Sequence, residues 1–147
     1  MEYRVKKKFD LRPMLNVFWI PGETVTDIVI DKRTQTMVVD SDEGQYEWPV
    51  STARKGINPK THRPYFTPSG HFYPQGLERM HYSKEYDNSP MPYSIFFKGG
   101  FAIHGTPHVG NLGRPASHGC VRLHPQNART LYDIVNHDRY DTRIVIR

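Results

Sequence analysis

Short apolar runs alternate with polar, turn-forming residues along most of the chain. From Thr26 onward, "TDIVIDKRTQTMVVDSDEGQYEWPV" holds apolar runs at 28–30 and 37–39 and a third run toward Val50. Short runs of β-branched and apolar residues between turn formers are typical of strands. We therefore predict an antiparallel meander over this part of the chain.

Two segments rich in proline interrupt this pattern. Residues 51–70 carry three prolines and two glycines without a regular period, which predicts a long loop that returns to the sheet near residues 71–73. Residues 76–93 have a similar composition, and we expect either a lid over a cleft or packed surface loops. Long loops in a compact domain are usually functional.

The second half of the chain contains a predicted hairpin and a predicted helix. "YSIFFKGGFAIHG" indicates two strands joined by a turn at 98–100, the second strand ending at His104. Strand alternation places Phe101 and Ile103 toward the core and His104 on the opposite face. After Cys120, a helix is expected with Pro125 in its first turn. Its apolar stripe follows three- and four-residue spacing, and comprises Ala128, Leu131, Tyr132 and Val135. A last strand is expected at 143–147.

Composition limits the possible functions. A chain of 147 residues is long enough for one real core, and its 12 prolines, 11 glycines and nine tyrosines favour a strand-rich fold. The net charge of +5 suits an anionic partner, but the cations are mostly scattered among acids, apart from "KKK" at 6–8. Since no nucleic-acid-binding motif is present, we expect a solvated basic surface and no nucleic-acid partner.

Residues 1–24 differ from the rest and are expected to form an arm that lies across the main domain, residues 25–147. No apolar run approaches the ~18 residues needed to span a bilayer. Asp10 and Pro13 interrupt the basic start before "MLNVFWI", and no small-residue cleavage site follows. If the protein is exported, we expect its signal to lie outside this sequence.

The segment "HGTPHVGNLGRPASHGC" ends on the only cysteine and contains three of the eight histidines. If "SHGCVRL" is extended, His118, Cys120 and Arg122 share one face, whereas Val121 and Leu123 share the other. The apolar pair can then anchor the strand in the core. A thiol beside a base and a cation is suited to nucleophilic catalysis.

Two histidines qualify as the general base for this thiol. His118 lies two positions from Cys120 on the same strand, at about 6–7 Å, which is too far for a direct contact. We therefore prefer His104, whose second ring nitrogen a backbone carbonyl or Thr106 would hold. Gly119 leaves room for a substrate, and the amides near Gly119 and Cys120 are candidate oxyanion donors.

Two other interpretations remain open on the residues alone. The histidines and the thiol offer enough ligands for a four-coordinate zinc site, namely His104, His108, His118, Cys120 and His124. However, the compact spacings of known zinc motifs are absent, so we expect no metal and no cofactor. The second interpretation is an inert cysteine among histidines whose hydrogen bonds are satisfied.

The motif residues resemble a known family. "IHGT", followed by "LGRPASHGCVRL" with sixteen positions from His104 to Cys120, is similar to the signature of the L,D-transpeptidase (YkuD) catalytic domain. "IVIDKRTQTMVV", "WPVSTARKG", "FTPSGHF" and "NARTLYDIV" resemble further elements of that domain in the same order. The resemblance covers roughly residues 25–147. It implies a mainly β fold, a β-sandwich or mixed sheets, with one main α-helix after the cysteine.

The resemblance also implies an activity: a two-step acyl transfer on bacterial peptidoglycan in the periplasm or cell envelope. Cys120 would attack the carbonyl of the third stem residue, commonly diaminopimelate, release the terminal D-alanine and form a thioester. His104 would accept and donate the proton. An amine of a neighbouring stem would then take the acyl group and form a 3-3 crosslink, although relatives also use an envelope protein, another amine or water as acceptor.

The roles of the remaining motif residues follow from the same resemblance. Ser117, His118 and Gly119 would shape the pocket and its oxyanion site, and Arg122 would hold a substrate carboxylate or brace the site. Position 105 is glycine where some relatives have serine, so we expect a backbone carbonyl to orient His104. A peptidoglycan hydrolase of the L,D-carboxypeptidase or endopeptidase type and a non-catalytic wall-binding domain remain alternatives.

Overall fold

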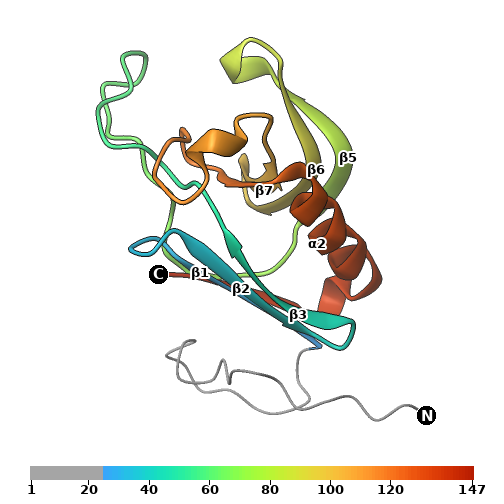
Figure 1. The fold of residues 1–147 in the computed structure, drawn as a ribbon. Helices are drawn as coiled ribbons and strands as arrows, with labels where there is room; N and C mark the ends of the chain where they lie inside the picture. The colour runs from blue at the N-terminus through green and yellow to red at the C-terminus, as the bar shows by residue number, and fades with distance from the viewer. Residues whose placement is uncertain (1–24) are drawn as a thin grey trace, which may run out of the picture.

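The computed structural model describes residues 25–147, and the arm expected at 1–24 lies outside the described residues. Two mixed β-sheets and one main α-helix form this part of the chain (Figure 1). The prediction of a mainly β fold with one main helix after the cysteine is confirmed.

The first sheet has five strands in the order β3-β2-β1-β9-β4. Its strands are β1 (Thr26–Asp31), β2 (Thr36–Ser41), β3 (Gly44–Pro49), β4 (Gly70–Phe72) and β9 (Thr142–Ile146). β2 pairs antiparallel with both β1 and β3, its neighbours along the chain, which confirms the predicted meander. The C-terminal strand β9 lies parallel to β1, and β4 pairs antiparallel with β9, so the long segment after β3 does return to this sheet.

The second sheet has four strands in the order β5-β6-β7-β8. They are β5 (Gly76–Ser83), β6 (Ser89–Lys98), β7 (Phe101–Gly105) and β8 (Val121–Leu123). The hairpin predicted around residues 98–100 is confirmed as β6 and β7. β7 and β8 run parallel, and the segment between them carries the short 3-10 helix Val109–Asn111.

The expectation of loops at 76–93 is wrong, because these residues form β5 and the first part of β6. The prolines that suggested a loop, Pro90 and Pro92, pair with β5, whereas β7 pairs only with the later part of β6. Proline is tolerated in a strand where its missing N–H faces an unpaired edge. Only the tip between the strands, with the 3-10 helix Lys84–Tyr86, is loop-like.

The helix α2 (Pro125–His137) begins as predicted, with Pro125 in its first turn and the His124 ring accepting a hydrogen bond from the Gln126 amide. Its predicted apolar stripe is buried, together with Ile134, and packs against β6 and β7. A last 3-10 turn, Arg139–Asp141, leads into β9. Among residues 25–147, no helix combines the length and apolar character that crossing a bilayer requires.

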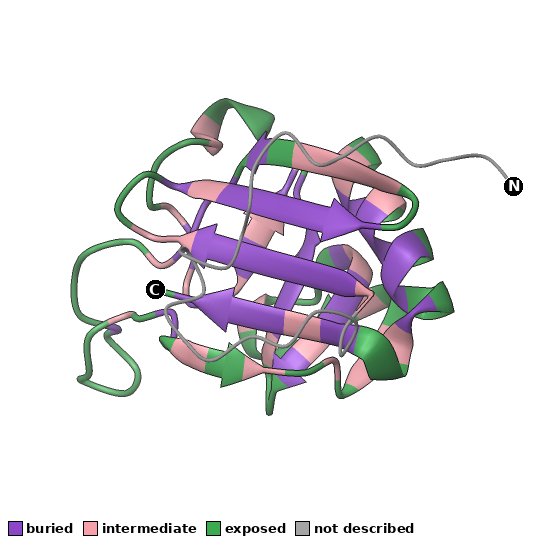
Figure 2. Cartoon of the chain, turned by 90° about the horizontal axis from the view of Figure 1, so that it is seen from below, coloured by how far each residue is buried: buried purple, intermediate pink, exposed green. Residues whose placement is uncertain are grey.

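The core lies between the two sheets and α2. Alternate residues of the central strands point into it, as period-two strands require. These residues include Ile28, Ile30, Met37, Val39, Ile144 and Ile146 from the first sheet and Ile95, Phe97, Ile103, Val121 and Leu123 from the second. Figure 2 shows the buried run along the central strands of the first sheet, β1, β2 and β9. The frame that results holds the ends of β7 and β8 in place.

Candidate active site

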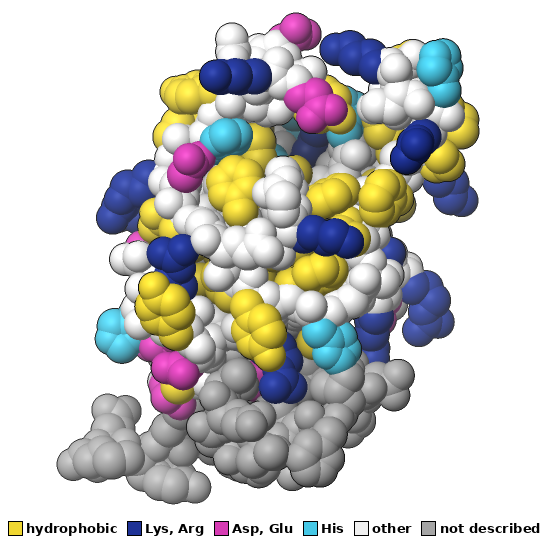
Figure 3. All heavy atoms as spheres, turned by 180° about the vertical axis from the view of Figure 1, so that it is seen from behind, with side chains coloured by type: hydrophobic (Ala, Val, Ile, Leu, Met, Phe, Trp, Pro, Cys, Tyr) yellow, Lys and Arg dark blue, Asp and Glu magenta, His cyan; other side chains and the backbone are white. Residues whose placement is uncertain are grey.

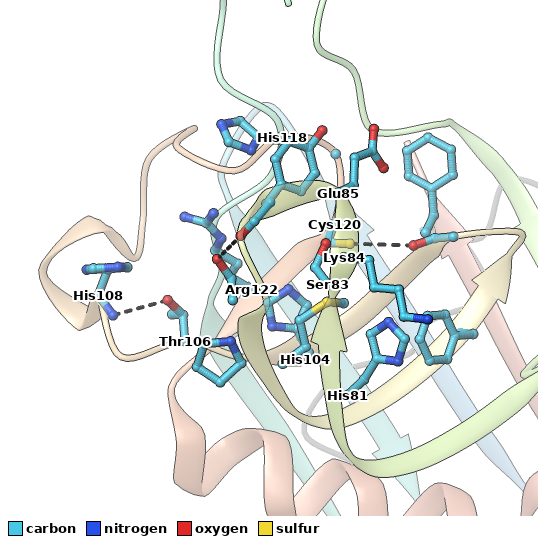
Figure 4. Close-up of a pocket in the computed structure, with 18 of the residues that line it drawn as sticks. His81, Ser83, Lys84, Glu85, His104, Thr106, His108, His118, Cys120 and Arg122 are labelled. Carbon is cyan, nitrogen blue, oxygen red and sulfur yellow. Dashed lines mark hydrogen bonds between the residues drawn. The ribbon is translucent and has the colours of Figure 1, made fainter. Parts of the chain in front are cut away.

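A pocket of about 630 Å³ lies over β7, β8 and the tip of the β5–β6 hairpin. His104, His118, Gly119, Cys120 and Arg122 all line it, so the structure brings these five predicted site residues together. Figure 4 shows the His104 ring and the Cys120 thiol pointing into the same pocket. The β5–β6 hairpin contributes further lining residues, among them His81 from β5 and Lys84, Glu85 and Tyr86 from the tip.

The parallel pairing of β7 with β8 sets the spacing of the reactive side chains. His104 lies directly opposite Arg122, and Ile103 lies opposite Val121. Val121 and Leu123 are fully buried in the core, while Arg122 lies on the pocket side, as alternation predicted. Cys120 directly precedes β8, so the thiol lies two residues before Arg122, on the same side as the His104–Arg122 pair.

His104 is buried, with 6% of its surface exposed. Its Nδ1 lies 2.7 Å from the Gly105 carbonyl oxygen, which fulfils the expectation of a backbone carbonyl. Because a carbonyl can only accept, Nδ1 carries the proton and Nε2 is left as an acceptor. Burial, aided by Arg122 and His81 and opposed by the Gly105 bond, lowers the pKa of His104 to about 4. The imidazole is therefore neutral at neutral pH.

Gly105 leaves little room for a side chain at that position. A Cβ built there would lie 3.2 Å from the Pro125 Cα and 3.2 Å from the Pro92 side chain. Both neighbours belong to packed elements, so a larger residue would have to move the start of α2. With no side chain at position 105, the group that contacts the His104 ring there is the backbone carbonyl of Gly105.

The Cys120 side chain is half-buried, and its sulfur lies 3.8 Å from the Gly100 carbonyl oxygen (Figure 4). Burial raises the pKa of the Cys120 thiol, and the Ala102 N–H and Arg122 oppose that rise only in part. With His104 neutral and Cys120 protonated, the resting pair is thiol and imidazole, not thiolate and imidazolium.

The turn before Cys120 is not the extended strand that the sequence predicted, since β8 begins only at Val121. Gly119 has φ +153°, and a Cβ there would meet the Phe101 ring at 2.8 Å and the Phe66 carbonyl oxygen at 3.0 Å. Only glycine fits this bend comfortably. The bend changes the direction of the chain between His118 and Cys120.

Ser117 lies behind the pocket rather than in its lining. It is fully buried, and its Oγ donates to the Cys120 carbonyl oxygen at 2.6 Å and accepts from the Gly119 N–H at 3.1 Å. The Ser117 hydroxyl thus holds the turn at 117–120 together through two hydrogen bonds to its backbone. Because the Gly119 N–H is already used in this turn, the Cys120 N–H is the better of the two candidate oxyanion donors.

Thr67 is a site residue that sequence reasoning missed. Its buried hydroxyl donates to the Gly119 carbonyl oxygen at 2.8 Å and accepts from the Ala53 N–H at 2.9 Å. This hydroxyl fixes the peptide that joins Gly119 to Cys120. A trans peptide directs its N–H opposite to its C=O, so the Cys120 N–H points away from Thr67. In the sequence, Thr67 belongs to the element "FTPSGHF". That element resembles the family, but it does not indicate a contact between Thr67 and the turn before Cys120.

Two tyrosines enclose His118, and nothing in the local sequence indicated them. The His118 ring stacks on Tyr65 at 4.9 Å between ring centroids and contacts Tyr86 at 4.4 Å. Burial, together with Arg122 and Arg54, lowers the pKa of His118, and Glu85 opposes this. His118 therefore joins the loop before β4 to the hairpin tip at the mouth of the pocket.

The Arg122 guanidinium contacts the Ala116 carbonyl oxygen at 3.5 Å, and burial lowers its pKa. His104, His108, His118 and Cys120 line one pocket, but their ligand atoms are not close enough to share an ion. Within residues 25–147, the three groups that are close enough are Glu43, His137 and Asp138. None of these was a predicted ligand.

His108 lines the pocket, and its backbone N–H donates to the Thr106 hydroxyl at 3.1 Å.

Solved structures with a similar fold include three L,D-transpeptidases. One from Mycobacterium smegmatis is 24% identical, with a TM-score of 0.67, and covers 84% of this chain and 59% of its own. One from Stackebrandtia nassauensis is 25% identical, with a TM-score of 0.66, and the match covers 83% of this chain and 55% of the relative. L,D-transpeptidase 3 from Mycobacterium tuberculosis, in complex with a faropenem-derived adduct, is 20% identical, with a TM-score of 0.67 and coverage of 84% and 60%.

This chain thus spans about three fifths of the length of these solved relatives. A comparison with curated proteins gave no match. The sequence model of the YkuD L,D-transpeptidase catalytic domain matches residues 26–146, which is nearly the whole described part and includes every pocket residue named above. This chain therefore belongs to the L,D-transpeptidase catalytic domain (YkuD) family.

Proposed function

We propose that this protein is a cysteine-dependent L,D-transpeptidase that acts on peptidoglycan stem peptides in the cell envelope. The observation that carries the proposal is the placement of Cys120 and of a neutral His104 in one pocket, with the His104 Nδ1 proton directed to the Gly105 carbonyl. The membership of the family supports the same substrate class.

In the first step, the Cys120 thiol gives its proton to Nε2 of His104 as the sulfur attacks the stem carbonyl. The new C–S bond and the negative oxygen form together, and the Cys120 N–H stabilises that oxygen. The imidazolium then returns its proton to the leaving amine as the C–N bond breaks. D-Alanine departs and a thioester remains on Cys120.

In the second step, an amine of another stem attacks the thioester. His104 takes the proton of that amine, the C–S bond breaks, and the sulfur regains a proton from His104. The product is a 3-3 crosslink. An envelope protein, another amine or water would follow the same route with a different acceptor.

The resting pair of thiol and neutral imidazole has a consequence for this mechanism. Proton transfer must accompany the attack, because the raised pKa of Cys120 and the lowered pKa of His104 both disfavour a preformed ion pair. Arg122 stands beside both groups and favours the thiolate as it develops. We assign Arg122 to this electrostatic role and to holding a substrate carboxylate.

The decisive experiment is mass spectrometry of the products formed from purified disaccharide-tetrapeptide. A crosslinked dimer, a hydrolysed tripeptide and an exchanged stem differ in mass, so the spectrum identifies the acceptor. Cys120→Ala should retain its circular dichroism spectrum and form none of these products. Undiminished turnover by Cys120→Ala would rule out the thiol mechanism.

Two further measurements separate the alternatives. Incubation with a penem or carbapenem should add the mass of the drug to Cys120, by analogy with the faropenem-derived adduct of the Mycobacterium tuberculosis relative. A chelator should leave turnover intact, and a loss that zinc restores would favour the zinc hydrolase. A folded protein that forms neither adduct nor product would favour a wall-binding domain.

A further inference from the structure

The loop between β3 and β4 contains a projecting segment, residues 54–65, which we call the basic finger. It is folded on itself: the Asn58 N–H donates to the Arg63 carbonyl at 2.8 Å, and the Tyr65 N–H donates to the Gly56 carbonyl at 3.0 Å. The buried Asn58 side chain also accepts from the Lys60 N–H at 2.9 Å. The finger is therefore an ordered support for the side chains on its surface.

Its surface carries one sign of charge. Arg54, Lys55, Lys60 and Arg63 are exposed, and no aspartate or glutamate occurs from Trp48 to Leu77. None of these four cations forms an ion pair with any residue between 25 and 147. Figure 3 shows the basic side chains spread over the finger, at the upper right. Such a surface attracts anionic groups over several ångströms.

The base of the finger lies at the mouth of the pocket. The Arg54 guanidinium lies 5.6 Å from the centre of the Tyr65 ring, and Tyr65 in turn stacks on His118 of the pocket wall. Asn58 also lies near Tyr86 on the hairpin tip, where its side chain opposes the rise in the Tyr86 pKa that burial causes. A polymer with one segment in the pocket therefore has its neighbouring segments within reach of the finger.

We propose that the basic finger is a docking surface for the carboxylate-bearing stem peptides of a peptidoglycan strand, and this rests on the proposed function. A tetrapeptide stem ends in the carboxylate of D-alanine, and diaminopimelate carries a carboxylate outside the chain. Each exposed ion pair between a cation of the finger and a stem carboxylate contributes little to the binding affinity. Several stems on one strand contact the finger together, and their contributions combine. The finger thus retains the strand while one stem reacts.

The test compares two double variants with the same change in charge. Lys60→Glu with Arg63→Glu alters the finger, and Arg33→Glu with Arg129→Glu alters exposed cations on the β1–β2 turn and on α2. Binding of soluble glycan strands with intact stems should fall about tenfold in the finger variant and less than about twofold in the control. At about 0.5 M salt the difference should vanish, because the Debye length is then only a few ångströms.

Two further ligands test the chemistry of the partner. Strands from which an amidase has removed the stems should bind the wild type and the finger variant equally weakly. Polyphosphate and a DNA duplex should bind the wild type more weakly than intact strands. Tighter binding to either polymer, an equal loss in both double variants, or unchanged binding by the finger variant would overturn the proposal.

A separate measurement keeps this proposal distinct from the proposed activity. The rate of covalent labelling of Cys120 by a carbapenem, a ligand much smaller than a glycan strand, should be the same in both double variants and in the wild type. Absence of labelling in the wild type would refute the catalytic proposal while the binding comparison still decided the role of the finger. A labelling rate that falls in the finger variant together with strand binding would show a disturbed pocket and overturn the assignment.

Discussion

The two sheets of this protein differ in regularity. In the first sheet, β1 pairs with β2 and with β9 without a break in register, and alternate residues enter the core. In the second sheet, the register shifts between Phe96 and Lys98, and the pairing of β5 with β6 passes over Arg79 and Tyr93. Tyr93 adopts φ 55°, a left-handed conformation that costs about 1–2 kcal/mol for such a residue.

The residues proposed for catalysis lie in or beside the irregular sheet. His104 and Arg122 occupy strand positions on its pocket side, and Cys120 lies at the bend that precedes β8. The regular sheet offers the pocket no side chain, yet it holds the core from which β7 and β8 project. The difference suggests that the first sheet determines stability and the second determines reactivity, and the variants below separate these two contributions.

The largest effect is expected at the base. Removing the imidazole in His104→Ala should lower the acylation rate by about 10²–10⁴-fold, since a positioned base contributes that much. Stopped-flow or mass-spectrometric labelling with a carbapenem measures this rate. The far-ultraviolet circular dichroism spectrum should be unchanged. A loss below about tenfold would mean that another group accepts the proton of Cys120.

The counterpart in the regular sheet is Ile30→Ala. Ile30 is fully buried, so its truncation leaves a cavity and should lower the free energy of unfolding by about 2–5 kcal/mol. Urea unfolding measures the change. The acylation rate per folded molecule should stay within about twofold of wild type, because Ile30 does not line the pocket. A drop in that rate as large as the one in His104→Ala would contradict the assignment of stability to the first sheet and reactivity to the second.

The irregular sheet should also make the protein sensitive to acid. His104 has a folded pKa of about 4, below its unfolded value of 6.5, so the unfolded chain binds more protons between these pH values. Stability therefore falls as the pH drops from 6.5 toward 4, by up to about 3 kcal/mol from this group. Unfolding of the wild type and of His104→Gln from pH 7 to 4 measures the difference in slope. Parallel curves would contradict the neutral buried imidazole.

A smaller effect is expected from Thr67, which reaches the site from the loop before β4. Thr67→Val keeps the volume and removes the hydroxyl that holds the Gly119 carbonyl, so the Cys120 N–H is less well aimed. The acylation rate should fall about tenfold, equivalent to about 1.4 kcal/mol. Thr67→Ser is the matched control, because it retains the hydroxyl and should stay near the wild-type rate. Equal rates in the two variants would show that this peptide needs no such support.

The sequence predicted the parts of the fold that local periodicity encodes. The meander of β1 to β3, the hairpin of β6 and β7, and α2 with its stripe all follow from apolar spacing and turn residues. The face shared by Cys120 and Arg122 followed from strand alternation, because Val121 and Leu123 required the core side. Local patterns could not predict β5, since none of its residues is buried and the prolines opposite it suggested a loop.

The sequence by itself determined which residues are proposed to carry the chemistry and which strands form the core. Only the tertiary structure decided what surrounds them: Thr67 on the Gly119 carbonyl, Tyr65 and Tyr86 on His118, and Ser117 turned away from the pocket. Each of these contacts depends on how separate segments meet. Periodicity within a segment specifies the face that is buried, whereas contacts between distant segments depend on the packing of the whole core.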